Sequence, residues 1–144
     1  MTGLVQDRAA LGRAAARGAA AFCLAFAAFQ VGLALGAPYG QMAWGGASLP
    51  VLPDNLRTAS AGAAVYLVLA AAVMLVRAGD LGARLPRRPF WWINLVLAIQ
   101  LALNTLGNLA AQGDAERYGM GAASAVGCLL CAAALSARPR PAAG

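Results

Sequence analysis

Two cysteines separated by two residues, Cys128 and Cys131, have the clearest potential for chemistry in this chain. A CxxC pair can exchange between dithiol and disulfide when one sulfur reacts as a thiolate. Both cysteines fall within a long apolar segment, where a thiolate is strongly disfavoured. The third cysteine, Cys23, also lies in an apolar segment. We therefore expect all three to be small apolar packing residues, with a thiol oxidoreductase as a less favoured alternative.

Four amide side chains recur along the apolar segment 90–111. At 3.6 residues per turn, they fall within about a third of the circumference of one helix. Polar side chains that lipid cannot solvate should face the interior of a helical bundle. The stripe predicts either hydrogen bonds between helices or a polar cavity for a headgroup or small solute. Its members are Asn94, Gln100, Asn104 and Asn108.

The chain has no histidine. Histidine is the side chain most used for proton transfer near neutral pH and for metal binding. Its absence excludes a hydrolytic triad or a histidine metal site, and we expect no metal ion and no cofactor.

Composition places these residues in a membrane protein. Apolar residues make up 61% of the 144 residues and charged residues 11%, whereas a soluble domain has about a quarter charged residues. The net charge of +6 comes from 11 arginines and no lysine. These arginines lie at the edges of apolar segments, where they meet anionic headgroups. Membrane lipids, and not nucleic acid, are the expected partners.

Four segments have the roughly 20 apolar residues that a spanning helix needs. They cover residues 18–36, 58–76, 90–111 and 118–137, with a flexible cytoplasmic tail at 138–144. We expect one all-α membrane domain, an antiparallel four-helix bundle. The basic start of the first segment, with Ala34 and Gly36 behind it, also fits a cleaved signal peptide. Its apolar run is long for a signal, and Gly32 with Gly36 suits close helix packing.

The arginines predict the orientation of this bundle. Positive charges in short loops accumulate on the cytoplasmic side. With four spans, all but Arg57 and Arg117 fall on one side, so both termini and the loop 77–89 are expected in the cytoplasm of a bacterial inner membrane. The arginines of that side are Arg8, Arg13, Arg17, Arg77, Arg84, Arg87, Arg88, Arg138 and Arg140.

The opposite, outer side carries the candidate binding site. Arg57 would supply a fixed positive charge, or pair with Glu116 across the mouth of the bundle. The amides would supply directional hydrogen bonds, and Trp44 an interfacial lid. The full set of predicted ligand-binding residues is Gln30, Trp44, Arg57, Asn104, Asn108 and Glu116.

Several of these residues belong to a pattern that resembles a family of small four-span bacterial membrane proteins without an assigned activity. The pattern covers about two thirds of the chain. The family has a Trp and a Pro shortly after its Glu-Arg pair, where this chain has Met120 and Gly121. The resemblance implies the four-span fold and a role for the outer face, and no chemistry. The matching residues are 36–40 (Gly-Ala-Pro-Tyr-Gly), 44–46 (Trp-Gly-Gly), Leu56-Arg57, Ser60, Asn108 and Glu116-Arg117.

Two alternatives come from other four-helix membrane proteins. A CxxC in such a bundle is similar to the vitamin K epoxide reductase and DsbB groups, but those enzymes use a second cysteine pair in an outer loop, and these loops have none. Small four-span proteins also form proton-coupled exporters, as in the small multidrug resistance family. None of the five carboxylates falls within a predicted span, which leaves a passive pathway or an accessory subunit. We favour a non-catalytic binding or accessory protein, as a homo-oligomer or with a membrane protein partner.

Overall fold

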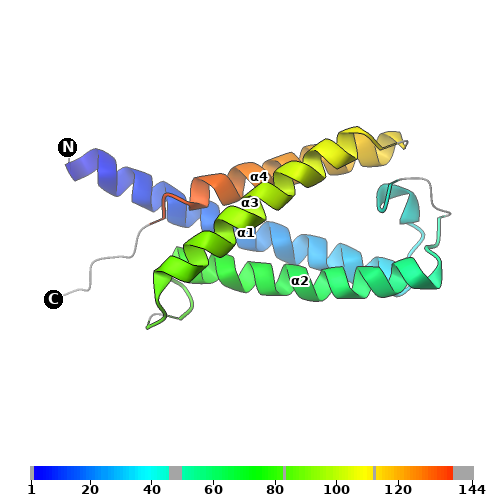
Figure 1. Cartoon of the computed structure of the whole chain (residues 1–144), viewed down its shortest axis with the longest axis horizontal. Coiled ribbons are helices and arrows are strands. Elements are labelled where there is room, and N and C mark those ends of the chain that lie inside the picture. The colour runs from blue at the N-terminus through cyan, green and yellow to red at the C-terminus, as the bar shows by residue number, and fades with distance from the viewer. Residues whose placement is uncertain (1, 46–49, 83, 112, 138–144) are drawn as a thin grey trace.

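The computed structural model describes residues 2–45, 50–82, 84–111 and 113–137. Every regular element among these residues is a helix, which confirms the all-helical prediction for the described part of the chain. Four helices are long and apolar enough to cross a membrane. Figure 1 shows the elements, which are α1 (Thr2–Ala34), the 3-10 turn η1 (Gly40–Met42), α2 (Asp54–Ala78), α3 (Arg87–Leu109), the π-helix η2 (Ala115–Met120) and α4 (Gly121–Ala134).

The helices begin before the predicted apolar segments. α1 begins at Thr2, well before the expected start at residue 18, and α2 begins at Asp54. Apolar length marks only the part of a helix that fits the hydrocarbon core, whereas polar residues continue the same backbone hydrogen bonding beyond it. The fourth predicted segment is divided, because η2 precedes α4. The predicted tail at 138–144 lies outside the described residues.

Alanines form the main core of the bundle. α1, α2 and α4 approach closely where their facing residues have small side chains, as is common for helices that pack within membranes. Met74 and Leu97 fill the larger gaps. The buried members of this alanine core are Ala15, Ala16, Ala19, Ala20, Cys23, Ala70, Ala71, Met74, Ala78, Leu97, Ala98, Cys131 and Ala134.

Arginine side chains form hydrogen bonds and ion pairs between helices at the end of the bundle where α2 ends. This end is called the arginine end. Arg77 donates hydrogen bonds to the carbonyl oxygens of Ala134, Leu135 and Ala137, at 3.2, 3.2 and 3.0 Å. These carbonyls lie at and just after the C-terminal end of α4, where a helix runs out of N–H partners four residues ahead. Because Arg77 is buried, its guanidinium serves as a cap for α4 supplied by another helix.

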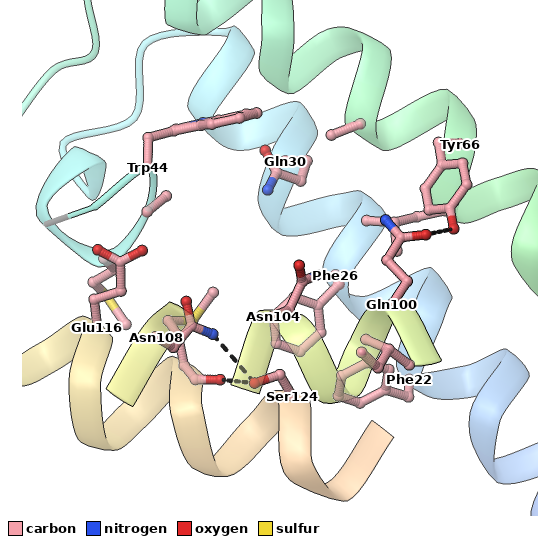
Figure 2. Close-up of a pocket in the computed structure, with 16 residues that line it drawn as sticks. Phe22, Phe26, Gln30, Trp44, Tyr66, Gln100, Asn104, Asn108, Glu116 and Ser124 are labelled. Atoms are coloured by element: carbon pink, nitrogen blue, oxygen red, sulfur yellow. Dashed lines mark hydrogen bonds between the residues drawn. The ribbon is translucent and has the colours of Figure 1, made fainter. Parts of the chain in front are cut away.

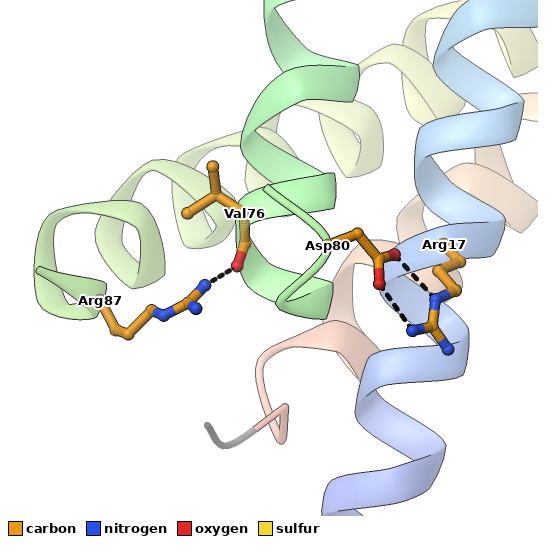
Figure 3. A network of polar contacts seen from close by, with 4 residues as sticks. All are labelled: Arg17, Val76, Asp80 and Arg87. Atoms are coloured by element: carbon orange, nitrogen blue, oxygen red, sulfur yellow. Dashed lines mark hydrogen bonds and ion pairs between the residues drawn. The ribbon is translucent and has the colours of Figure 1, made fainter. Parts of the chain in front are cut away.

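Two further arginines connect α1, α2 and α3 at the same end, as Figure 3 shows. Arg17 forms a two-pronged ion pair with Asp80, with nitrogen–oxygen distances of 2.8 and 2.7 Å. Arg87, at the start of α3, donates a hydrogen bond to the Val76 carbonyl oxygen near the end of α2. The arginine end is therefore closed by contacts between side chains and backbone from all four helices.

The opposite end, called the loop end, is built around the connection between α1 and α2. The chain leaves α1 through Gly36, whose φ of +94° is accessible at little cost only to glycine. Arg57 lies beside this turn, and its Nε donates to the carbonyl oxygen of Ala34 over 2.9 Å. A small apolar cluster of Leu33, Ala43 and Leu52 anchors the loop on the bundle.

Candidate functional site: a cavity at the loop end

A cavity of about 400 Å³ lies between the four helices and the loop, at the loop end of the bundle. Its volume falls in the range of small-molecule sites. Figure 2 shows polar side chains from different elements pointing into one space. Of the predicted site residues, the structure places five in the lining, namely Gln30, Trp44, Asn104, Asn108 and Glu116.

Each long wall of the cavity is a row of residues spaced four apart. Residues at i and i+4 lie one above the other on the same face of a helix, so such a row lines a groove. The rows are Phe22, Phe26 and Gln30 on α1, Ala63 and Leu67 on α2, Gln100, Asn104 and Asn108 on α3, and Glu116, Met120 and Ser124 on η2 and α4.

Trp44 covers the cavity from the loop. Its backbone φ of +60° is uncommon for a residue other than glycine, and Gly45 follows at +96°. This local conformation is held by a hydrogen bond from the indole Nε1 to the hydroxyl oxygen of Ser60 over 3.0 Å. Since Ser60 is fully buried on α2, it fixes the indole at a defined position.

Glu116 is the charged residue of the lining, and it is 5% exposed. The π-helix η2 carries it at the start of the α4 arm, and widened π turns recur at functional sites. Its Oε1 accepts a hydrogen bond from the backbone N–H of Gly45 over 3.1 Å. Its Oε2 is buried without a hydrogen-bond partner among the described residues.

The arginine next to Glu116 turns away from the cavity. Nε and Nη2 of Arg117 donate to the carbonyl oxygen of Ala111, at 3.1 and 2.8 Å. This contact closes the connection between α3 and η2, where α3 has ended. Arg117 therefore satisfies a backbone acceptor and does not pair with the carboxylate of its neighbour Glu116.

The amide stripe on α3 divides into two roles. Asn108 Nδ2 donates to the hydroxyl oxygen of Ser124 over 3.2 Å, and the hydroxyl of Thr105 bonds to Ser124 over 3.1 Å, so this part joins α3 to α4. Gln100 accepts a hydrogen bond from the hydroxyl of Tyr66 on α2 (Figure 2). Asn108 and Gln100 both connect helices and line the cavity. The two roles predicted from the sequence, hydrogen bonding between helices and lining a polar cavity, therefore occur together in the stripe.

Two amides retain unpaired atoms. Gln30 Oε1 is buried in the cavity wall and has no hydrogen-bond partner in the part of the chain that the structure describes. Asn94, the first member of the stripe, is 0% exposed, and neither polar atom of its side chain has a partner among the described residues. Asn94 lies outside the cavity lining, so the stripe reaches beyond the site.

Arg57 does not line the cavity. Its guanidinium bonds to the Ala34 carbonyl and lies 3.4 Å from a carboxylate oxygen of Asp54. The pair between Arg57 and Glu116 considered from the sequence is not formed. The physical reason is the turn at Gly36, which brings a backbone acceptor within reach of the arginine.

The positions of three carboxylates differ from the sequence prediction. The sequence predicted that no carboxylate lies within a membrane span. The fourth helix that is long and apolar enough to span a membrane covers Ala115–Ala134, and it includes the buried Glu116. Asp7 and Asp54 likewise fall within the first and second candidate spans, Gln6–Ala34 and Asp54–Ala78. The difference arises because the helices continue past the apolar segments.

Aromatic and aliphatic lining residues were missed by the sequence analysis. Phe22, Phe26, Tyr66 and Met120 carry no signal of their own in an apolar segment. Most of them could have been found from their spacing along a helix. Phe26 and Phe22 lie four and eight residues before Gln30, and Met120 lies four residues after Glu116, so each falls on the same side of its helix as a predicted site residue.

None of the three cysteines is a lining residue of the cavity, and all three are free thiols. Cys23 and Cys131 belong to the alanine core, and Cys131 is 1% exposed. Cys128 Sγ lies 3.5 Å from the carbonyl oxygen of Ala98.

Comparison of the chain with protein-family models, with curated proteins and with solved structures finds no match.

Proposed function

We propose that this protein is a small integral membrane protein that binds the headgroup of a lipid or a similar amphiphile in the cavity at the loop end. In this proposal the four helices form an antiparallel bundle in a bacterial inner membrane, with both termini in the cytoplasm. The positive-inside distribution of the arginines supports that orientation. The loop end then faces outward, and the cavity begins at the outer headgroup level.

The observation that carries the proposal is the presence of buried, unpaired polar atoms in a preformed cavity. Within the described ranges of the chain, Glu116 Oε2 and Gln30 Oε1 both lack hydrogen-bond partners there. A buried polar group without a partner costs free energy, which a ligand with hydrogen-bond donors recovers on binding. Phe22, Phe26 and Leu67 provide an apolar surface deeper in the same cavity, as an amphiphile requires.

The depth of the cavity fits a headgroup and the first part of an acyl chain. Because α1 rises about 1.5 Å per residue, Phe22 lies roughly 18 Å along the helix from Ala34. That distance is about half of a hydrocarbon core of ~30 Å. Beyond Phe22 the alanine core fills the space between α1, α2 and α4.

This closed core makes the small transporter or passive permeation subunit the less favoured alternative. A continuous pathway would have to pass between alanines that are buried and packed against one another, such as Ala16, Ala19 and Ala71. A thiol and quinone oxidoreductase is also less favoured, because Cys131 is buried in that core and is not a lining residue of the cavity.

A cavity-filling variant tests the proposed function. Ala63 lines the cavity, whereas Ala61 on the same helix is exposed and outside it. Ala63→Phe should remove stoichiometric lipid binding, and Ala61→Phe should leave it unchanged. Native mass spectrometry of the detergent-purified proteins, after addition of a lipid mixture, measures the bound lipid. Equal lipid retention by the wild type and both variants would show binding to the outer surface of the helices and refute the proposal.

A further inference from the structure

The charge of the cavity lining selects the chemical class of its ligand. Glu116 supplies a carboxylate, and no arginine lies among the lining residues. The cavity is therefore negative inside a chain whose net charge is +6. An anionic group such as a phosphate would be repelled within it, whereas a cation would be attracted.

The carboxylate of Glu116 also lacks a positively charged hydrogen-bond donor among the described residues. Its Oε1 receives one backbone N–H, from Gly45, while its buried Oε2 receives none. Arg57 and Arg117, the arginines of the loop-end segments, bond to backbone carbonyls instead. A buried carboxylate is stabilised most by a charge-assisted hydrogen bond.

The remaining lining suits an ammonium group. Gln30 Oε1 is a second acceptor without a partner, and an ammonium group has up to three N–H donors. Trp44, Tyr66 and Phe26 add aromatic surfaces, which attract cations through their π faces. Figure 2 shows Gln30 between Trp44 and Phe26, on the wall that Glu116 faces from η2.

We infer that the cavity binds an ammonium-bearing amphiphile, with the ammonium on Glu116 Oε2 in the polar part of the cavity that Gln30 also lines, and the apolar part along Phe22 and Phe26. This inference rests on the proposed function and specifies its ligand. The ammonium belongs either to the headgroup of a zwitterionic lipid or to a free amphiphilic amine. Any phosphate of a lipid lies outside the cavity, at the mouth beside Trp44.

Three probes and two matched variants test this inference. The probes are phosphatidylethanolamine, phosphatidylglycerol with the same acyl chains, and octylamine, each titrated into detergent-purified protein and followed by native mass spectrometry. Glu116→Gln removes the buried charge with little change of shape. Asp114→Asn removes an exposed charge from the same segment and serves as the control.

Phosphatidylethanolamine should bind the wild type and Asp114→Asn more tightly than phosphatidylglycerol, and Glu116→Gln should weaken it by about tenfold or more. If octylamine alone shows the same dependence on Glu116, the ligand is a free amine, and the inference still holds. Gln30→Met should weaken the same probe, which gives an independent test should Glu116→Gln fail to fold.

Equal binding of both lipids, unaffected by Glu116→Gln and Gln30→Met but abolished by Ala63→Phe, would refute the ammonium site and leave the proposed function standing. Failure of every probe to bind the wild type would refute both.

Discussion

The indole Nε1 of Trp44 and the hydroxyl oxygen of Ser60 lie 3.0 Å apart and form a hydrogen bond between the loop and α2. Ser60 is fully buried, so the indole is fixed from within the bundle. The backbone of the same loop reaches the other side of the cavity, where the N–H of Gly45 bonds to Glu116. The cover of the cavity is thus fastened on both sides.

Trp44→Phe keeps an aromatic ring and removes this donor. We expect a loss of about 1 kcal/mol in the free energy of unfolding, because a hydrogen bond to a buried hydroxyl is lost, together with weaker ligand binding. The change is measured by unfolding the protein in detergent. Circular dichroism follows the loss of helix, because this signal does not rely on the replaced tryptophan. Ser60→Ala should have a similar effect, and the double variant should lose little more. Fully additive losses would contradict a direct bond between the two side chains.

Gly12→Ala tests the close packing at the arginine end. A Cβ at this position would lie 2.3 Å from the backbone nitrogen of Ala137, which cannot move without shifting the end of the α4 arm. We expect destabilisation of about 1–3 kcal/mol, measured by thermal unfolding in detergent. Gly62→Ala is the matched control, because nothing lies within 4 Å of its added Cβ and alanine favours a helix. Equal effects of the two variants would show that Gly12 is not a packing position.

Arg77→Gln tests the cap that α2 supplies to α4. Removing the guanidinium deletes three hydrogen bonds to buried or partly buried carbonyls, of which those of Ala134 and Leu135 keep a second donor, so we expect a loss of about 2 kcal/mol or more. Arg77→Lys should recover part of it, since an ammonium lacks the planar fork of donors. Chemical denaturation in mixed micelles gives the comparison. Arg88→Gln, at an exposed position, should change little; a loss equal to that of Arg77→Gln would point to net charge as the cause.

Thiol accessibility separates the binding protein from the oxidoreductase. Cys131 and Cys23 are buried in the alanine core, whereas Cys128 is half-buried. N-ethylmaleimide should therefore modify Cys128 first and the other two only after denaturation, as peptide mass spectrometry will show. Quinone-dependent formation of a disulfide between Cys128 and Cys131 in the folded protein would contradict the packing role and favour the enzyme.

The sequence predicts the helices well because the determinants of a membrane helix are local. A run of apolar residues must satisfy its own backbone hydrogen bonds, and a helix does so without reference to distant residues. The same reasoning identifies Gln30, Asn104 and Asn108, since polar residues in such a run face the interior. All three line the cavity.

Other features depend on geometry that spacing does not determine. The sequence did not predict that Arg57 bonds to the carbonyl oxygen of Ala34. This acceptor is within reach of Arg57 because of the turn at Gly36. The burial of Glu116 depends on the π-helix η2, whose irregular turn leaves no simple periodicity in the sequence. The sequence also identifies Asn94 as interior, but the lack of partners for its side chain among the described residues is visible only in the structure.

The division of contacts between the two helical pairs allows an order of assembly. The partners of Trp44, Arg57 and Arg17 named above all lie within residues 2–82, so the pair of α1 and α2 can make these contacts without α3. The contacts of Glu116 and Arg77 join the first pair to the second. The cavity is completed only when the second pair docks, and a ligand bound there would hold the two halves of the newly made protein together.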